Sequence, residues 1–114
     1  MDAPRLSVNA ETLTGEYFAG KPVYAKIIDI GAMPNNTTKT IGTGIEGAGY
    51  FWIDTSNSMV RNGGASYPIP YADPAQSASD ISVRLYNGGK TLAVWTKADW
   101  STYSGFVTIK YTKL

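Results

Sequence analysis

The chain has no cysteine and no histidine among its 114 residues. Without cysteine, neither a disulfide nor a thiolate metal site can form, so the fold must rest on packing alone. Without histidine, imidazole-based catalytic triads and most transition-metal sites cannot be built. These two absences remove the commonest designs of hydrolases and metalloenzymes, and we expect neither a metal nor a cofactor.

Charge is also scarce in this sequence. Charged residues make up 17% of the chain, the formal net charge is +1, and lysines and arginines form no run. Nucleic-acid binding needs a basic stripe that neutralises phosphates, so nucleic acid is not an expected partner. No window reaches 18 apolar residues, and the N-terminus lacks a basic flank followed by an apolar core. We therefore expect neither membrane insertion nor a signal peptide.

Carboxylates are the catalytic groups that this composition leaves. Glycosidases use a pair of them, which six acidic residues between positions 29 and 99 could supply. These residues stand at expected strand ends and turns, where aspartate commonly hydrogen-bonds the local backbone. We therefore expect that the protein is not an enzyme. The six are Asp29, Glu46, Asp54, Asp73, Asp80 and Asp99.

What the sequence does contain is alternation of apolar and polar residues, with 12 glycines and 6 prolines between the alternating runs. No 11-residue window holds the spacing of an amphipathic helix, so the pattern predicts an all-β chain. A chain of this length forms one domain, and six to eight short antiparallel strands fold into two packed sheets or a barrel. The expected strands are 22–30, 40–45, 49–54, 81–87, 91–97 and 105–113.

The remaining segments are expected to be arm, turn and loop. Residues 1–13 are interpreted as an arm or linker, and residues 14–114 as the β domain. The polar segment 55–80 contains three prolines and predicts mostly surface loop and edge. Within it, Asn62-Gly63-Gly64 is the clearest hairpin signal.

Aromatic residues are the enriched class, with 8 tyrosines and 3 tryptophans. Such side chains are common both in cores and at binding surfaces. For Trp52 and Trp95, which lie within expected strands, the pattern favours the core. Trp100 lies in a polar connection, so it either caps one end of the sheets or faces a partner. Arg61 and Asn62 flank a turn, from which they either hydrogen-bond a hydroxylated ligand or are merely solvated.

Two further aromatic positions bear on association. Phe106 falls on the second face of the last expected strand, and Tyr86 is exposed by the hairpin that precedes it. A sheet with apolar groups on both faces commonly meets another copy of itself under closed symmetry. The pattern therefore predicts a homo-oligomer.

Four segments in a fixed order resemble a known domain. Over residues 14–113 the chain is similar to the C-terminal domain of bacteriophage and prophage tail fibres and tail spikes. This resemblance implies an antiparallel β-sandwich, jelly-roll-like and trimeric, at the tip of a fibre shaft. The segments are Lys21-Pro22-Val23-Tyr24, Pro34-Asn35-Asn36-Thr37-Thr38-Lys39, Pro68-Ile69-Pro70-Tyr71 and residues 99–113.

The resemblance has a gap in its most informative part. Family members often carry a histidine where this sequence has residues 40–44, so no ion or ligand of that histidine is carried over. Residues 46–66 resemble the family least, and the identity of a ligand cannot be inherited.

The resulting expectation is a non-catalytic receptor-binding tip in the phage tail, made in the host cytoplasm. Its expected partners are a host surface polysaccharide or other cell-wall glycan, two further copies of the chain and the upstream fibre shaft. Loops near 55–64 and 72–79 would face the host. Two alternatives remain: a structural trimerisation or capping module of a virion fibre, and a carbohydrate-binding module of a secreted enzyme. The expected ligand-binding residues are Trp52, Arg61, Asn62, Tyr71, Trp100 and Tyr103.

Overall fold

The computed structural model describes residues 7–75 and 79–114. Residues 1–6 of the expected arm and residues 76–78 of the expected host-facing loop lie outside this range. The described residues form eight strands and no α-helix, and none of them could cross a membrane as a helix. The strands are β1 (Thr12–Phe18), β2 (Lys21–Ala32), β3 (Thr38–Gly42), β4 (Ala48–Asn62), β5 (Ala65–Pro68), β6 (Ile81–Tyr86), β7 (Thr91–Thr96) and β8 (Ser104–Lys113).

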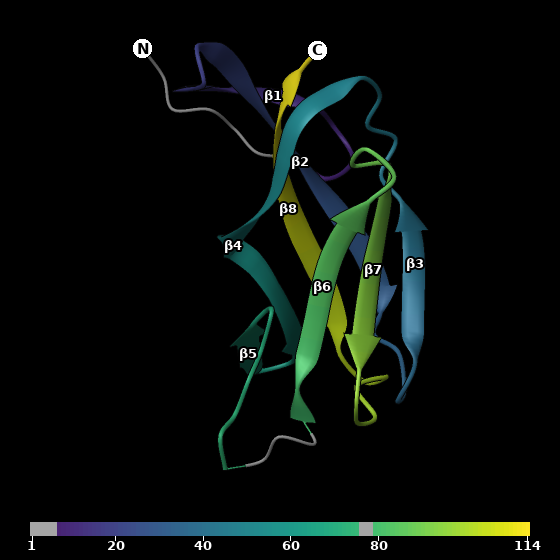
Figure 1. Ribbon diagram of the computed structural model, residues 1–114. Helices are drawn as coiled ribbons and strands as arrows, with labels where there is room; N and C mark the ends of the chain where they lie inside the picture. The colour runs from purple at the N-terminus through teal and green to yellow at the C-terminus, as the bar shows by residue number, and fades with distance from the viewer. Residues whose placement is uncertain (1–6, 76–78) are drawn as a thin grey trace.

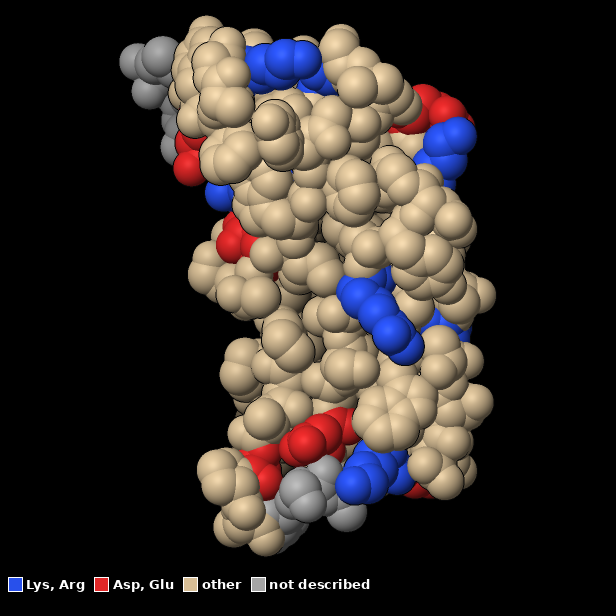
Figure 2. All heavy atoms as spheres, in the orientation of Figure 1, with Lys and Arg blue, Asp and Glu red and all other residues tan. Residues whose placement is uncertain are grey.

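The strands make two antiparallel sheets that lie one over the other (Figure 1). One sheet has five strands in the order β1-β2-β8-β4-β5, and the other has three in the order β3-β7-β6. The all-β prediction is confirmed, and the two layers are compatible with the expected β-sandwich. On the face seen in Figure 2, lysines and arginines are scattered, and some of them lie beside acidic residues.

The last strand of the chain, β8, lies at the centre of the larger sheet. It pairs with β2 on one side and β4 on the other, with Ile109 opposite both Lys26 and Ile53. Strict alternation turns Val107, Ile109 and Tyr111 toward the smaller sheet, and all three are fully buried. The chain therefore ends on the strand that organises its core.

The core fills the space between the two sheets. The smaller sheet contributes Leu92 and Val94 of β7, which have no exposed surface and join residues of β2, β4 and β8 in one cluster. Burying such side chains stabilises the fold by about 1.5–3 kcal/mol each. Without disulfides, this cluster is what holds the two layers together.

Strand β4 corrects the loop expectation for residues 55–62, whereas β5 at residues 65–68 is an edge strand as expected. Strand β4 continues to Asn62 after an irregularity in which Asp54 pairs with Thr108 but Met59 with Phe106. Five steps along β4 thus match two along β8, so this is a bulge. Extra residues break the alternation that would have shown the strand in the sequence. The hairpin at Gly63-Gly64 is confirmed by the pairing of Asn62 with Ala65.

Two tryptophans are not where the pattern placed them. Trp95 pairs with Thr38 and Ser82 on the outer face of the smaller sheet, because its neighbours Val94 and Thr96 point into the core. Trp52 pairs with Lys110 on the outer face of the larger sheet. Both side chains are half-buried. The core interpretation was therefore wrong for both.

The hairpin of β1 and β2 curls over the outer face of the five-stranded sheet. Two strands separate β1 from β4 in the sheet, yet the ring centroids of Phe18 and Trp52 are 5.1 Å apart. The curl follows an irregular register between Leu13 and Tyr17, where Gly15 has a φ of 84°. A left-handed backbone suits glycine because it has no Cβ. The curl raises one side of the outer face.

Candidate functional site

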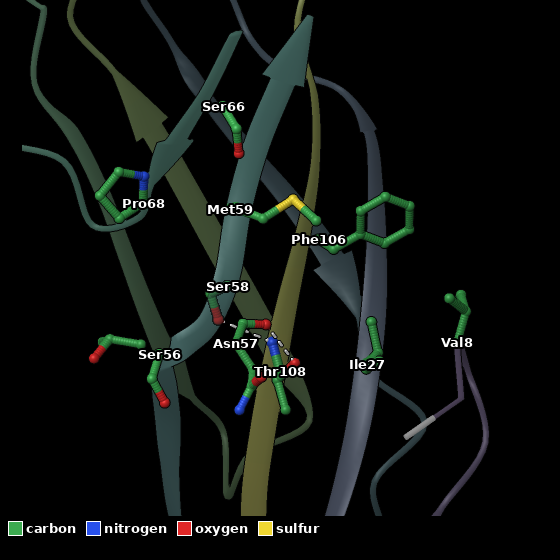
Figure 3. A pocket seen from close by; sticks show the side chains of 11 residues that line it. Val8, Ile27, Ser56, Asn57, Ser58, Met59, Ser66, Pro68, Phe106 and Thr108 are labelled. Carbon is green, nitrogen blue, oxygen red and sulfur yellow. Dashed lines mark hydrogen bonds between the residues drawn. The ribbon is translucent and has the colours of Figure 1, made fainter. Parts of the chain in front are cut away.

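A groove with a volume of about 730 Å³ lies on the outer face of the five-stranded sheet. Met59 of β4 and Phe106 of β8 lie side by side in its middle (Figure 3). Val8 and Ile27 stand on one side, where the Asn9 amide N donates a 2.7 Å hydrogen bond to the carbonyl oxygen of Ile27. The other lining residues are Thr55, Ser56, Asn57, Ser58, Ser66, Pro68 and Thr108.

The polar wall of the groove is the bulge at residues 55–58, and the side chain of Asp54 organises it. Asp54 Oδ1 accepts hydrogen bonds from Ser56 N at 3.2 Å and from Ser56 Oγ at 2.7 Å. Asp54 Oδ2 accepts one from Asn57 Nδ2 at 2.7 Å. Aspartate commonly folds the backbone that follows it in this way.

The bulge is also tied to the central strand. Ser58 Oγ donates to the Asp54 carbonyl oxygen at 2.8 Å and accepts from Thr108 N at 3.0 Å. Thr108 Oγ1 donates to the Asn57 carbonyl oxygen at 2.6 Å. These bonds fix the wall before any ligand arrives, which lowers the entropy lost on binding.

Charge beside the groove is neutralised within the protein. Lys110 Nζ lies 2.8 Å from Glu16 Oε1 and 3.6 Å from Asp54 Oδ2. Burial alone would raise the pKa of Asp54, but hydrogen bonds from Asn57 and Ser56 and the Lys110 charge bring it below its ordinary value. A glycosidase acid needs a raised pKa. Asp54 is thus suited to holding structure and not to donating a proton.

A second hollow, which we call the turn pocket, continues the groove at the β4–β5 hairpin. Its volume is about 360 Å³, and it shares Phe106 with the groove. Asn62 Nδ2 donates to Thr102 Oγ1 at 3.4 Å, and Arg61 pairs with Ser104 across the strands. The expected residues Arg61 and Asn62 thus line one pocket. Thr102 and Ser104 supply hydroxyl groups to the same pocket.

An aromatic shelf lies toward the opposite end of the outer face. It consists of Phe18, Tyr50 and Trp52, which with Phe51 line a hollow of about 370 Å³. The Phe18 ring centroid is 5.3 Å from that of Tyr50, nearly edge-on. Tyr50 is 55% exposed and Phe18 is 47% exposed. Of the expected site residues, Trp52 belongs to this shelf.

The other three expected residues, Tyr71, Trp100 and Tyr103, meet in a separate aromatic cluster with Tyr67. The centroids of Trp100 and Tyr103 are 4.8 Å apart, and Trp100 is only 7% exposed. Trp100 is therefore part of the core and has almost no surface for a ligand. The structure corrects the alternative in which Trp100 faces a partner.

Sequence reasoning identified part of the groove. Asn57 and Met59 fell in the segment 55–64 that was expected to face the host, though as a loop, and Ile27 fell within a strand with no sign of a ligand role. The alternation of the last strand did place Phe106 and Thr108 on its second face, which is the face that carries the groove. That alternation and the polar character of segment 55–64 were the available signals.

Comparisons with models of known families, with curated proteins and with solved structures found no match to this chain. Within residues 7–75 and 79–114, no three acidic side chains are grouped so that they could hold a metal ion.

Proposed function

We propose that this domain is the tip of a phage tail fibre and attaches the virion to a bacterium by binding a surface glycan, without catalysis. One observation carries the binding role: the groove joins an apolar floor to a polar wall that is already rigid. A sugar ring offers an apolar C–H face and a rim of hydroxyls, and such a groove complements both. The tail-fibre context rests on the sequence resemblance.

The geometry of the groove fits recognition of hydroxyl groups at modest strength. Phe106 and Met59 supply apolar contact, while Asn57 and Ser66 supply amide and hydroxyl groups on either side of them. Arg61 and Asn62 add charged and neutral donors at the adjoining turn pocket. From the sequence resemblance we also propose that the domain is a jelly-roll-like homotrimer on a fibre shaft. Several copies of a weak site would then raise the effective binding by about 10²–10⁴-fold through multivalency.

The proposal is tested on an array of bacterial lipopolysaccharides and capsular polysaccharides with the purified domain. We expect saturable binding that falls about tenfold in Arg61→Ala, which removes a charged hydrogen-bond donor worth about 1.4 kcal/mol. Arg84→Ala is the matched control, since Arg84 is also an exposed arginine but lies on β6 of the other sheet. Silence across the array and on live cells, or equal loss in both variants, would contradict the proposal.

A purely structural trimerisation module is the second candidate function, and the surface of β1 favours it. Tyr17 is 73% exposed, and Leu13 of the same strand is 55% exposed. Exposed apolar patches commonly mark association surfaces. Light scattering distinguishes the outcomes: a trimer that binds no glycan supports this second function. A particle of 12.3 kDa at micromolar concentration contradicts trimerisation in either form.

A further inference from the structure

The aromatic shelf, the groove and the turn pocket follow one another along β4 and β8. Strand register gives their order, because Trp52 pairs with Lys110, Met59 with Phe106, and Arg61 with Ser104. Six residues of β8 separate the first pairing from the last, which at about 3.4 Å per residue is about 20 Å. The three hollows therefore form one line on one face.

The charged side chains described between the shelf and the groove are paired with one another, although the Glu16 side chain is 59% exposed. Lys110, which occupies that position, is 21% exposed and is held by Glu16 and Asp54. At the next junction, Phe106 lines both the groove and the turn pocket. A ligand that crosses these junctions meets a paired cation and then an aromatic ring, and neither requires an unpaired charge to be buried.

The line is bordered on both sides. Phe18 and Val8 line the hollows on the side of β1, and Ser66 and Pro68 of β5 line the groove on the other. A line of hollows between two sides suits a chain-shaped ligand, whereas a single terminal sugar would need only one of them.

We propose that this face binds an extended oligosaccharide of several rings, which runs along β8 from the aromatic shelf to the turn pocket. One ring packs on Trp52 and Phe18, the middle of the chain occupies the groove, and Arg61 holds hydroxyls at the far end. This inference rests on the proposed function and adds the substrate class: an interior stretch of a polysaccharide. Arg61 supports a ligand rich in hydroxyl groups. In the part of the chain that the structure describes, its side chain has no ion-pair partner, so it can donate hydrogen bonds to a ligand.

The test uses the O-chain polysaccharide of a strain that the domain binds, cut into single sugar units and longer fragments. Calorimetric titration measures the affinity of the wild-type domain and of Trp52→Ala for each size. We expect the longer fragments to bind about tenfold more tightly than the single unit, because they reach the shelf. Trp52→Ala should remove about that tenfold and leave the single unit unchanged.

Controls separate this inference from the proposed function. Trp95→Ala removes an equally half-buried tryptophan from the outer face of the other sheet and should change neither affinity. Tyr50→Ala, at an exposed position, should reproduce the Trp52 effect even if Trp52→Ala fails to fold. Equal affinity for both sizes, with Arg61→Ala still weakening them, would overturn the extended mode and leave glycan binding intact. Absence of binding to either size would overturn both.

Discussion

The most informative single change is Asp54→Ala, because one carboxylate organises the polar wall of the groove. Its two oxygens accept three hydrogen bonds, from Ser56 N, Ser56 Oγ and Asn57 Nδ2, and the side chain also pairs with Lys110. The Asp54 side chain is 10% exposed, while its partners Ser56 and Asn57 are exposed. Without it, the bulge keeps only its links through Ser58 and Thr108.

The expected loss of stability follows from counting those interactions. Hydrogen bonds contribute about 0.5–1.5 kcal/mol each, so three of them amount to about 1.5–4.5 kcal/mol, and the exposure of Ser56 and Asn57 favours the lower part of that range. In a domain of this size that loss lowers the Tm by about 10 °C or more. Urea denaturation followed by tryptophan fluorescence measures the free energy directly. Glycan affinity should fall as well, because the wall is no longer fixed in advance.

Asp99→Ala is the matched control. Asp99 Oδ1 also accepts from the backbone N and Oγ of a serine two residues later, Ser101, but at an exposed turn outside the groove. We expect its loss to cost less than about 1 kcal/mol and to leave glycan binding unchanged. An Asp54→Ala variant as stable as wild type, or no less stable than Asp99→Ala, would refute the role given to Asp54.

Gly105→Ala should cost about 1–3 kcal/mol in urea denaturation, because an added Cβ would lie 2.8 Å from one core side chain and 3.1 Å from two others. Trp100→Ala should cost about 3–5 kcal/mol and more than Trp95→Ala, and the reverse order would contradict the burial of Trp100. Acid should destabilise the fold, because folding lowers the pKa of both Glu11 and Asp54. For Glu11 the main cause is the hydrogen bond that it accepts from the buried Tyr111. The stabilisation by both carboxylates is complete above the unfolded pKa of about 4 and is lost as pH falls through the lowered values; unfolding free energy that stays flat from pH 5 to pH 2 would contradict this.

The architecture could be predicted where alternation was regular. Regular alternation of apolar and polar residues predicts the hairpin of β6 and β7 and the two faces of β8. The glycines predict the turn at Asn62-Gly63-Gly64. The continuation of β4 could not be predicted, since a bulge inserts polar residues that read as loop. The curl of β1 over the sheet depends on long-range contacts that leave no local pattern.

The site was predicted in part, for a related reason. Arg61 and Asn62 could be singled out because they flank a turn, and they do share a pocket. The groove itself is assembled from β2, β4, β5 and β8, which meet only after folding. Trp100 misled because polar neighbours surround it in sequence, while in the fold it is covered by Tyr67, Tyr71 and Tyr103.

Mapping a bound glycan on the surface tests the central claim most directly. Amide NMR spectra of the labelled domain, recorded during titration with fragments of the bound O-chain polysaccharide, would report which residues sense the ligand. We expect the shifted amides to follow the outer face of β4 and β8, from Trp52 through Met59 and Phe106 to Arg61. Shifts gathered on β6 and β7, or spectra that do not change at millimolar fragment, would contradict the account.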